Sequence, residues 1–353
     1  MWQPPSLDHL AELTDETGLL QHALGDIPNR EYGYCTDDVS RGFIVACGAA
    51  RHTRLRPEAV RLARNYLSFL HDAQLPDGRF HNFMSYDRRW LDEVGTEDSI
   101  GRSIWSVGVG VSHAPRSAWR DLCGDMLERA VPVVHDLQHL RPLAYAALGL
   151  SEACKTPQRE LASIEAALRE IGSRLRAAYE TAHTGDWEWF EPVMTYDNAR
   201  LPEALLRVGR ALDDRDLIAL GLRTLDFYES VVIEGGVFVP IGNAGWYRHG
   251  GQRARYEQQP LEAAAMVDVA LVAHALSGEA RYRRLAETAL EWFYGRNTRN
   301  VVMAAGGGSF DGLGELGVNR NMGAESSLAY LASALALAQP AAEELRIARS
   351  QVR

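Results

Sequence analysis

Three times the chain places Thr-x-Asp at the head of an apolar stretch, with an arginine three or four residues further on. The copies are Thr36–Asp38 with Arg41, Thr96–Asp98 with Arg102, and Thr195–Asp197 with Arg200. Threonine is a favoured helix N-cap, and the helix macrodipole stabilises a carboxylate in the first turn. The motif therefore predicts three helix starts that each carry an acid. If these starts converge on one cavity, they supply the paired carboxylates that cleavage of a glycosidic bond requires.

We predict Asp38, Asp98 and Asp197 as catalytic residues. Glycoside hydrolysis uses one protonated carboxyl group as the acid and one ionised carboxylate. A helix N-terminus favours the ionised form, whereas burial or a like charge raises the pKa. Because Glu97 adjoins Asp98, we assign Asp98 as the acid, with Asp38 or Asp197 as the base that activates water.

The long segments between apolar stretches hold side chains of the types that bind sugars. Aromatic faces pack against sugar C–H surfaces, and carboxylate, amide and guanidinium groups hydrogen-bond to hydroxyls. We therefore predict that substrate is bound by Asp37, Arg41, His81, Asn82, Asp87, Glu97, Arg102, Trp187, Trp189, Tyr196, Arg200, Trp246, Gln258, Gln259, Asn321 and Glu325.

Two kinds of segment with helical spacing alternate along the chain. One kind is rich in small residues and lies at 42–50, 101–112, 144–153, 201–212, 261–276 and 326–338. The other kind is amphipathic and lies at 57–70, 117–134, 159–180, 216–232, 281–295 and, as a shorter piece, 341–350. Small residues allow backbones to approach closely, and an amphipathic helix has one wet face. The alternation predicts an inner and an outer ring of helices.

The segments repeat six times with a period of about 57 residues, which is typical of helical-hairpin repeats. We predict an all-α fold, an (α/α)6 barrel, as a single domain over 1–353, with 1–30 as an N-terminal helix and lead-in segment. Short connections lead from inner to outer helices. Four long loops, at 75–95, 183–194, 233–257 and 296–320, lead back to the same end of the barrel. Long loops usually carry function, so this end is the predicted functional face.

Composition and charge exclude several classes of protein. The net charge is −10 and no Lys/Arg-rich run occurs, so we expect no nucleic-acid partner. The sequence shows neither a run of about 18 apolar residues nor a signal peptide, so we expect no membrane span and a cytoplasmic location. The four cysteines and the histidines lack metal-ligand spacing, and we expect no metal and no cofactor.

Simpler interpretations of these motifs stay open. Each Thr-x-Asp copy could be only a capped helix with an ion pair, although three copies at matched positions beside long loops favour a site. We expect Trp105, on a predicted inner helix, to be a core residue. The Gly306–Gly308 run lacks the Lys-Ser/Thr of a P-loop.

Five segments carry a resemblance to a known superfamily: 33–42 (GYCTDDVSRG), 80–102, 187–205, 256–267 and 319–331. Together with the hairpin period, they cover nearly the whole chain. The chain resembles the six-hairpin glycosidase superfamily, and within it a bacterial subgroup found in polysaccharide and glycosyltransferase contexts. The resemblance implies an (α/α)6 barrel that acts on sugars, with glycosyltransferases or other glycan enzymes as partners. The adjacent Asp37 and Asp38 look like the paired aspartates of α-mannanase-type members.

The leading hypothesis is a glycoside hydrolase acting on a bacterial oligosaccharide. A sugar epimerase or isomerase on the same barrel would need a histidine pair, for which His81 and His139 are the candidates. A non-catalytic glycan-binding domain accessory to a glycosyltransferase would use the same aromatic residues. A terpene-cyclase or prenyltransferase toroid is disfavoured because the predicted cavity lining is too polar for a carbocation.

Overall fold

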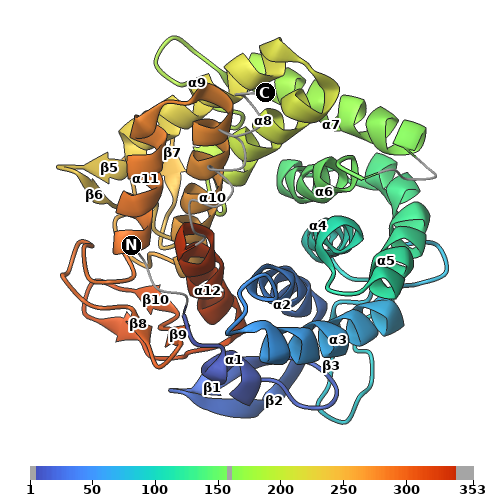
Figure 1. The fold of residues 1–353 in the computed structure, drawn as a ribbon. Helices are drawn as coiled ribbons and strands as arrows, with labels where there is room; N and C mark the ends of the chain where they lie inside the picture. Colours follow the sequence, from blue (N-terminus) through green and yellow to red (C-terminus); the bar gives the residue numbers. More distant parts are fainter. Residues whose placement is uncertain (1–4, 157–160, 339–353) are drawn as a thin grey trace.

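The helices form two concentric rings in the computed structural model, which describes residues 5–156 and 161–338 (Figure 1). The inner ring consists of α2 (Thr36–Ala49), α4 (Glu97–His113), α6 (Leu140–Ala153), α8 (Arg200–Leu212), α10 (Pro260–Ser277) and α12 (Ala324–Ala338). The outer ring contains α3 (Arg56–Ala73), α5 (Ser117–Ala130), α7 (Leu161–Ala182), α9 (Arg215–Val232) and α11 (Ala280–Glu291). The predicted (α/α)6 barrel and the order of its rings are confirmed.

The inner ring is closed. Each inner helix packs on the next one, and α12 packs back on α2. Each outer helix packs on the inner helix before it, and the short η1 (Val131–Asp136) extends α5. The predicted amphipathic piece at 341–350 and the start of the one at 159–180 lie outside the described residues. On the outer side of α12 lie α1 (Asp8–Glu12) and β9 (Gly308–Ser309).

Small residues allow α4 and α6 to cross with their backbones in close approach. A methyl group added to Gly108 would collide with the backbone of Gly149, and one added to Gly149 would collide with the carbonyl oxygen of Ile104. A Cβ on Gly101 would lie 2.5 Å from the carbonyl oxygen of Pro142. These glycines let the two backbones touch, as the small-residue composition predicted.

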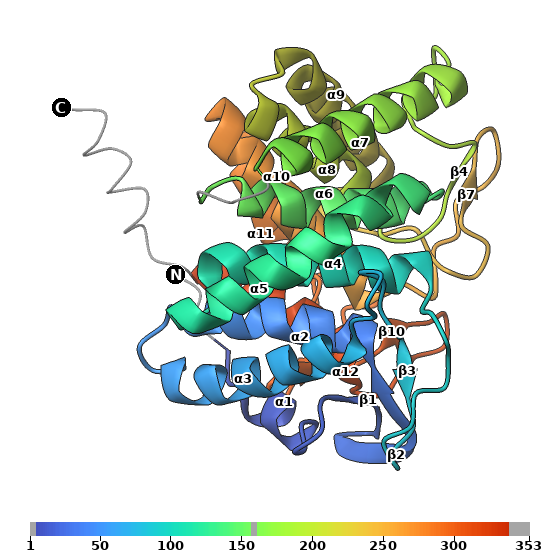
Figure 2. The same cartoon turned by 90° about the vertical axis from the view of Figure 1, so that its right-hand side faces the viewer.

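The long loops gather at one end of the barrel, where the inner helices begin (Figure 2). They carry short antiparallel pairs: β4 (Val193–Met194) with β7 (Tyr247–Arg248), β5 (Ile233–Glu234) with β6 (Val237–Phe238), β8 (Ala304–Ala305) with β9, and β10 (Gly312–Leu313) with β11 (Val318–Asn319). The N-terminal segment continues from α1 into a hairpin of β1 (Leu20–Leu24) and β2 (Ile27–Cys35), with β3 (Phe83–Met84) beside β2. The lead-in therefore includes strands that the sequence analysis did not predict.

Helix α10 is long and apolar enough to cross a membrane by length and composition, with a mean hydropathy of 1.3. It is nevertheless one member of the closed inner ring, and 61% of it is buried inside the protein. A core helix with both neighbours packed against it accounts for this composition.

The α4–α6 crossing predicts a position-dependent effect of one methyl group. Gly149→Ala should destabilise the fold by about 1–3 kcal/mol, because the added Cβ overpacks the crossing. Gly48→Ala in α2 is the matched control, since a Cβ there meets nothing within 4 Å and alanine is the better helix former. Urea denaturation of both variants checks this, and equal stabilities would contradict the crossing geometry.

Candidate active site

The three Thr-x-Asp copies start helices in different ways. Thr96 is the N-cap of α4, and its Oγ1 accepts the N–H of Ser99 at 3.3 Å, which confirms that prediction. Thr36 is instead the first residue of α2, and its buried hydroxyl has no hydrogen-bond partner. Asn82 replaces it as the cap from another loop, because its carbonyl and amide oxygens accept the N–H groups of Thr36 (2.7 Å) and Asp37 (3.4 Å).

Asp197 lies before α8 rather than in its first turn, so the predicted helix start is wrong here. Its backbone is left-handed, with φ of 48°, and Ala199 is the N-cap of the helix. Glu262, from the first turn of α10, accepts the backbone N–H of Asp197 and that of Asn198. The hydroxyl of Tyr228 donates to the same carboxylate at 3.0 Å. A neighbouring inner helix therefore holds the turn that the local Thr195 was expected to cap.

The guanidinium group of Arg102 joins four inner-ring segments. Its Nη1 lies 2.6 Å from Asp37 and 3.7 Å from Asp98. Its Nη2 donates to the Tyr145 hydroxyl at 2.6 Å and to Asp197 at 3.3 Å, and the Tyr145 hydroxyl donates in turn to Asp197 at 2.7 Å. The three Thr-x-Asp copies are therefore brought together, as predicted, through the arginine of one copy and the carboxylates of all three.

The other two arginines extend this cluster around the ring. Arg41 lies 3.0 Å from Asp38 in its own helix and 2.8 Å from Glu325 in α12. Arg200 pairs with Asp197 at 3.4 Å and with Asp268 of α10 at 2.8 Å. We call Asp37, Asp38, Arg41, Asp98, Arg102, Tyr145, Asp197, Arg200 and Glu325 the arginine–carboxylate cluster.

Sequence reasoning missed Arg141, which supports the rim of the cluster. Its side chain lies over the ring of Tyr196, with Cζ 4.8 Å from the ring centroid, and pairs with Glu191 at 2.8 Å. The Tyr196 hydroxyl donates to Asp98 at 2.8 Å. Arginine at the head of a small-residue segment is the signal that could have found it, because Arg41 and Arg102 occupy the same place in their segments.

Exposure divides the carboxylates of the cluster into two groups. The side chains of Asp38 and Asp197 are only 6% and 5% exposed. Those of Asp98 and Glu325 are 25% and 37% exposed, and Asp37 lies between the groups at 17%. Asp98, Asp37 and Glu325 are therefore the carboxylates that a large ligand can touch first.

The two buried carboxylates differ in protonation. Burial raises the pKa of Asp38 to about 8, and the charges of Asp37 and Glu325 act in the same direction against Arg41. Burial also acts to raise the pKa of Asp197, but the cations of Arg200 and Arg102, with the hydrogen bond from Tyr145, hold it below its ordinary value. At neutral pH the carboxyl group of Asp38 is therefore protonated, and that of Asp197 is ionised. For Asp38 this differs from the ionised base that its place near a helix N-terminus suggested.

Several polar atoms of the cluster are buried without a hydrogen bond. They are Asp37 Oδ1, Arg102 Nε, Asp197 Oδ1 and Arg200 Nε. Asp197 Oδ1 and Arg200 Nε nevertheless form an ion pair with each other at 3.4 Å, and Asp37 Oδ1 lies 3.5 Å from a guanidinium nitrogen of Arg41. Their concentration at one place is typical of a site where polar chemistry is kept at the expense of stability.

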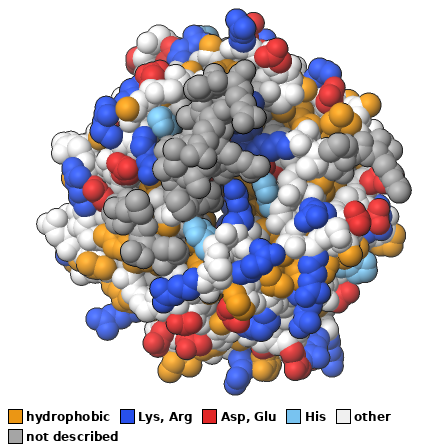
Figure 3. All heavy atoms as spheres, in the orientation of Figure 1, with side chains coloured by type: hydrophobic (Ala, Val, Ile, Leu, Met, Phe, Trp, Pro, Cys, Tyr) orange, Lys and Arg blue, Asp and Glu red, His pale blue; other side chains and the backbone are white. Residues whose placement is uncertain are grey.

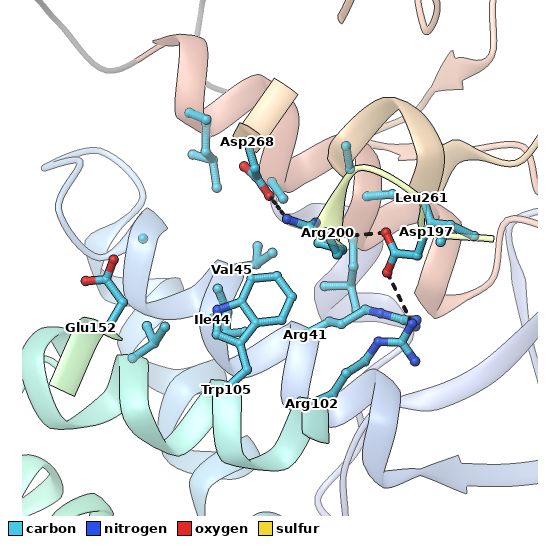
Figure 4. Close-up of a pocket in the computed structure, with 18 of the residues that line it drawn as sticks. Arg41, Ile44, Val45, Arg102, Trp105, Glu152, Asp197, Arg200, Leu261 and Asp268 are labelled. Carbon is cyan, nitrogen blue, oxygen red and sulfur yellow. Dashed lines mark hydrogen bonds and ion pairs between the residues drawn. The ribbon is translucent and has the colours of Figure 1, made fainter. Parts of the chain in front are cut away.

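A cavity of about 240 Å³ lies behind the cluster, along the barrel axis (Figure 4). Arg41, Arg102 and Asp197 line one end, and Glu152 lies toward the other. Trp105 packs against the hydrophobic core, as expected, and its half-buried side chain also borders the middle of the cavity. The guanidinium group of Arg200 lies over the indole ring of Trp105, with Cζ 4.7 Å from the ring centroid.

Some predicted substrate-binding residues belong to the core. Trp187 and Trp189 are buried, at 1% and 0% exposure, so neither can present a ring to a sugar. Gln258 is fully buried, and its amide oxygen accepts the indole N–H of Trp292 at 2.8 Å. Both tryptophans pack inward because their loop folds back on α9, where Trp187 contacts Phe227 and Trp189 contacts Tyr228.

Other predicted binding residues have structural partners in the loops. His81 stacks on Trp90, with ring centroids 4.7 Å apart, and its Nδ1 is bound to the carbonyl oxygen of Asp92. Asn82 is buried as the cap of α2. Asn321 accepts the backbone N–H of Ala23 at 2.9 Å.

Four further predicted residues lie around the rim. Glu97 accepts the N–H of His139 at 3.0 Å and so fixes the approach to α6. Asp87 and Trp246 are exposed in their loops, and Gln259 is the N-cap of α10 without a side-chain cap bond. Contact of these residues with substrate stays a prediction.

Within residues 5–156 and 161–338, no group of three or more His, Cys, Asp or Glu side chains is placed to hold a metal ion. The chemistry of the described cluster is that of carboxylates, guanidinium groups and tyrosine hydroxyls.

Solved structures with the same fold act on sugars, according to their descriptions. A sugar epimerase from a ruminal bacterium matches with a TM-score of 0.71 and 12% identity, over 94% of this chain and 95% of that one. The GH76 α-mannanase of Bacteroides thetaiotaomicron matches at 0.67 and 10%, over 97% and 95%. A cellulase of C. cellulolyticum matches at 0.61 and 8%, over 91% and 87%. No family model and no curated protein sequence matches the chain. At these identities the likeness shows the fold alone, and that fold is the (α/α)6 barrel.

The support of Asp197 by Glu262 gives a testable prediction. Glu262→Gln would turn an amide N–H₂ toward one of three donors, which leaves that donor unpaired. We expect a loss of about 1–3 kcal/mol in unfolding free energy. Glu165→Gln, on the exposed face of α7, is the control and should change stability by less than about 0.5 kcal/mol. A Glu262→Gln variant as stable as the control would show that the turn does not depend on this carboxylate.

Proposed function

We propose that this protein is a glycan-active enzyme, and specifically a glycoside hydrolase with its catalytic centre at the arginine–carboxylate cluster. The observation that carries the proposal is the opposite shift of two carboxyl pKa values within one cluster, upward for Asp38 and downward for Asp197. Two carboxyl groups whose surroundings separate their pKa values form an acid–base pair. The sugar-active descriptions of the fold neighbours support the same substrate class.

In this proposal the sugar binds on the long-loop side, against the exposed carboxylates of Asp98, Asp37 and Glu325. Asp38, in place of the Asp98 assigned from the sequence, turns from its buried position toward the sugar and gives its proton to the glycosidic oxygen as the bond from that oxygen to the anomeric carbon breaks. Asp197 takes a proton from the water whose oxygen bonds to the anomeric carbon. The two proton transfers leave Asp38 ionised and Asp197 protonated, and exchange with solvent resets them. Direct attack by water makes the outcome inverting.

The epimerase alternative receives less support from the site. Proton abstraction next to a carbonyl would use a histidine pair. Among the residues that line the axial cavity, the histidine is His113, and it is bound to Glu152 at 3.1 Å. His81 is held by Trp90 and Asp92, and His139 is exposed at the start of α6.

We further propose an oligosaccharide substrate, a cytoplasmic setting and a role alongside glycosyltransferases. The four cysteines are free, which suits a reducing compartment. A panel of defined oligosaccharides, incubated with and without phosphate and followed by NMR, tests the reaction class. Release of a second sugar without phosphate supports hydrolysis, whereas turnover only with phosphate would make the enzyme a phosphorylase.

The two proposed roles predict different responses to the leaving group. Asp38→Asn and Asp197→Asn should each lower kcat on a natural glycoside by about 100–10,000-fold. On a nitrophenyl glycoside, Asp38→Asn should recover because this leaving group departs without a proton, whereas Asp197→Asn should not. Glu165→Gln is the unaffected control. Wild-type turnover in both aspartate variants would rule out the assignment.

The pKa of Asp38 sets the alkaline limit of activity. Because the acid must be protonated, kcat should fall as the pH rises through about 8. Asp197 must be ionised, and its lowered pKa keeps the acidic limit below the ordinary aspartate range. A kcat–pH profile of the wild type measures both limits. A rate that is constant from pH 6 to well above the pKa of Asp38 would contradict its role as the acid.

A further inference from the structure

The inner ring surrounds the axial cavity laterally. All six inner helices, with Asp197 before α8, contribute to its lining. The part of the wall formed by α2 and α12 is apolar, with residues such as Ile44, Val45 and Leu328. Because the ring is closed, molecules can enter this cavity only along the barrel axis.

The opposite wall is a continuous series of ion pairs that leads away from the cluster. Arg200, which pairs with Asp197, also pairs with Asp268 at 2.8 Å and with Glu203 at 2.6 Å. Glu203 in turn binds Arg207 at 2.7 Å. Asp268 keeps 21% of its side chain exposed, and both Asp268 and Arg207 line the cavity. This wall therefore offers charged partners to a polar ligand along its length.

The series continues to the end of the barrel where the inner helices finish. Arg207 lies 2.8 Å from Glu152, which also binds His113 at 3.1 Å. His113 is 36% exposed and lines the cavity together with the exposed Arg51. Figure 3 shows this face, with basic and histidine side chains gathered near the hollow at its centre. The cavity thus extends from solvent-exposed side chains to Asp197.

Water is a ligand that fits this space. The cavity of about 240 Å³ is smaller than the roughly 300–1,000 Å³ of pockets that hold drug-sized ligands. A cavity holds ordered water when it is roomy and offers two to four polar partners per molecule, and the ion-pair wall supplies them. An inverting hydrolase also needs water on the side of the sugar opposite the leaving group. A sugar bound on the long-loop side would cover the front of the cluster, which leaves the axial cavity as a path for this water.

We infer that the axial cavity is a water conduit, which brings the hydrolytic water from the short-loop face through the barrel to Asp197 behind the bound sugar. The inference rests on the proposed hydrolase function, because only hydrolysis consumes water there. It adds a second entrance to the site, separate from the entrance of the sugar.

A crystal structure of the wild-type protein with a bound oligosaccharide tests the contents of the cavity. We expect ordered waters along the Glu152–Arg207–Asp268 wall up to Asp197, and the sugar on the long-loop side. A cavity without water, or one occupied by a sugar unit, would overturn the inference. The contents of the cavity can be determined even if the protein proves not to be a hydrolase. Failure of the water conduit can therefore be distinguished from failure of the proposed hydrolase function.

Filling the cavity tests the delivery of water. Ala332 and Ala336 of α12 line the cavity and are half-buried, so Ala332→Leu and Ala336→Leu each place a larger apolar group in the water path at a different depth. Each variant should lower kcat at least about tenfold while KM changes less than about twofold, because sugar binding is untouched.

Ala162→Leu is the matched control, because it makes the same change on the exposed side of α7 and should leave kcat unaltered. Circular dichroism and the unfolding midpoint identify a variant that fails to fold. In that case, the variant at the other depth in the cavity provides the test. A folded variant whose crystal structure shows a filled cavity but whose kcat equals that of the wild type would contradict the conduit.

Discussion

The guanidinium group of Arg102 is the constraint on which the rest of the site depends. One planar cation on α4 contacts Asp37 at the start of α2, Tyr145 on α6 and Asp197 before α8. Its side chain is only 5% exposed, so the carboxylates around it compensate a buried positive charge. The positions of three helix ends are thereby linked. The closed inner ring, with its glycine-mediated α4–α6 crossing, holds these ends at the distances the cation requires.

The cluster shows how the barrel can tolerate a polar centre. The inner helices bury many apolar side chains, whereas the cluster keeps charged groups, several of whose buried atoms are ion-paired or solvent-inaccessible without a hydrogen bond. Such groups lower stability, and the large packed core around them offsets the loss. The same arrangement separates two carboxyl groups in protonation, since Asp38 is buried with like charges and Asp197 is surrounded by cations. Acid–base chemistry thus follows from packing, without a group whose ordinary pKa lies near 7.

The sequence was sufficient for the fold because the fold depends on periodicity. Small-residue and amphipathic segments alternate with a period that is typical of helical-hairpin repeats, and the loop lengths indicate the end of the barrel at which the long loops gather. The convergence of the three Thr-x-Asp copies was predictable for the same reason, although the first copy contacts Arg102 through Asp37 rather than through the predicted Asp38. The capping of Asp197 by Glu262 and of Asp37 by Asn82 was not, because these contacts join residues far apart in the chain. The inward packing of Trp187 and Trp189 likewise could not be predicted, because it depends on the path of a loop and a loop has no sequence periodicity.

Hydrolysis and epimerisation on this barrel differ in which bond is broken, and this difference can be measured directly. The reaction should be run in D₂O with an oligosaccharide that the enzyme turns over, and both products followed by proton NMR. Hydrolysis at the arginine–carboxylate cluster predicts two sugar products, a new reducing end of inverted configuration and no deuterium on any carbon. A single product of unchanged length, with deuterium at the carbon next to the carbonyl, would contradict the account.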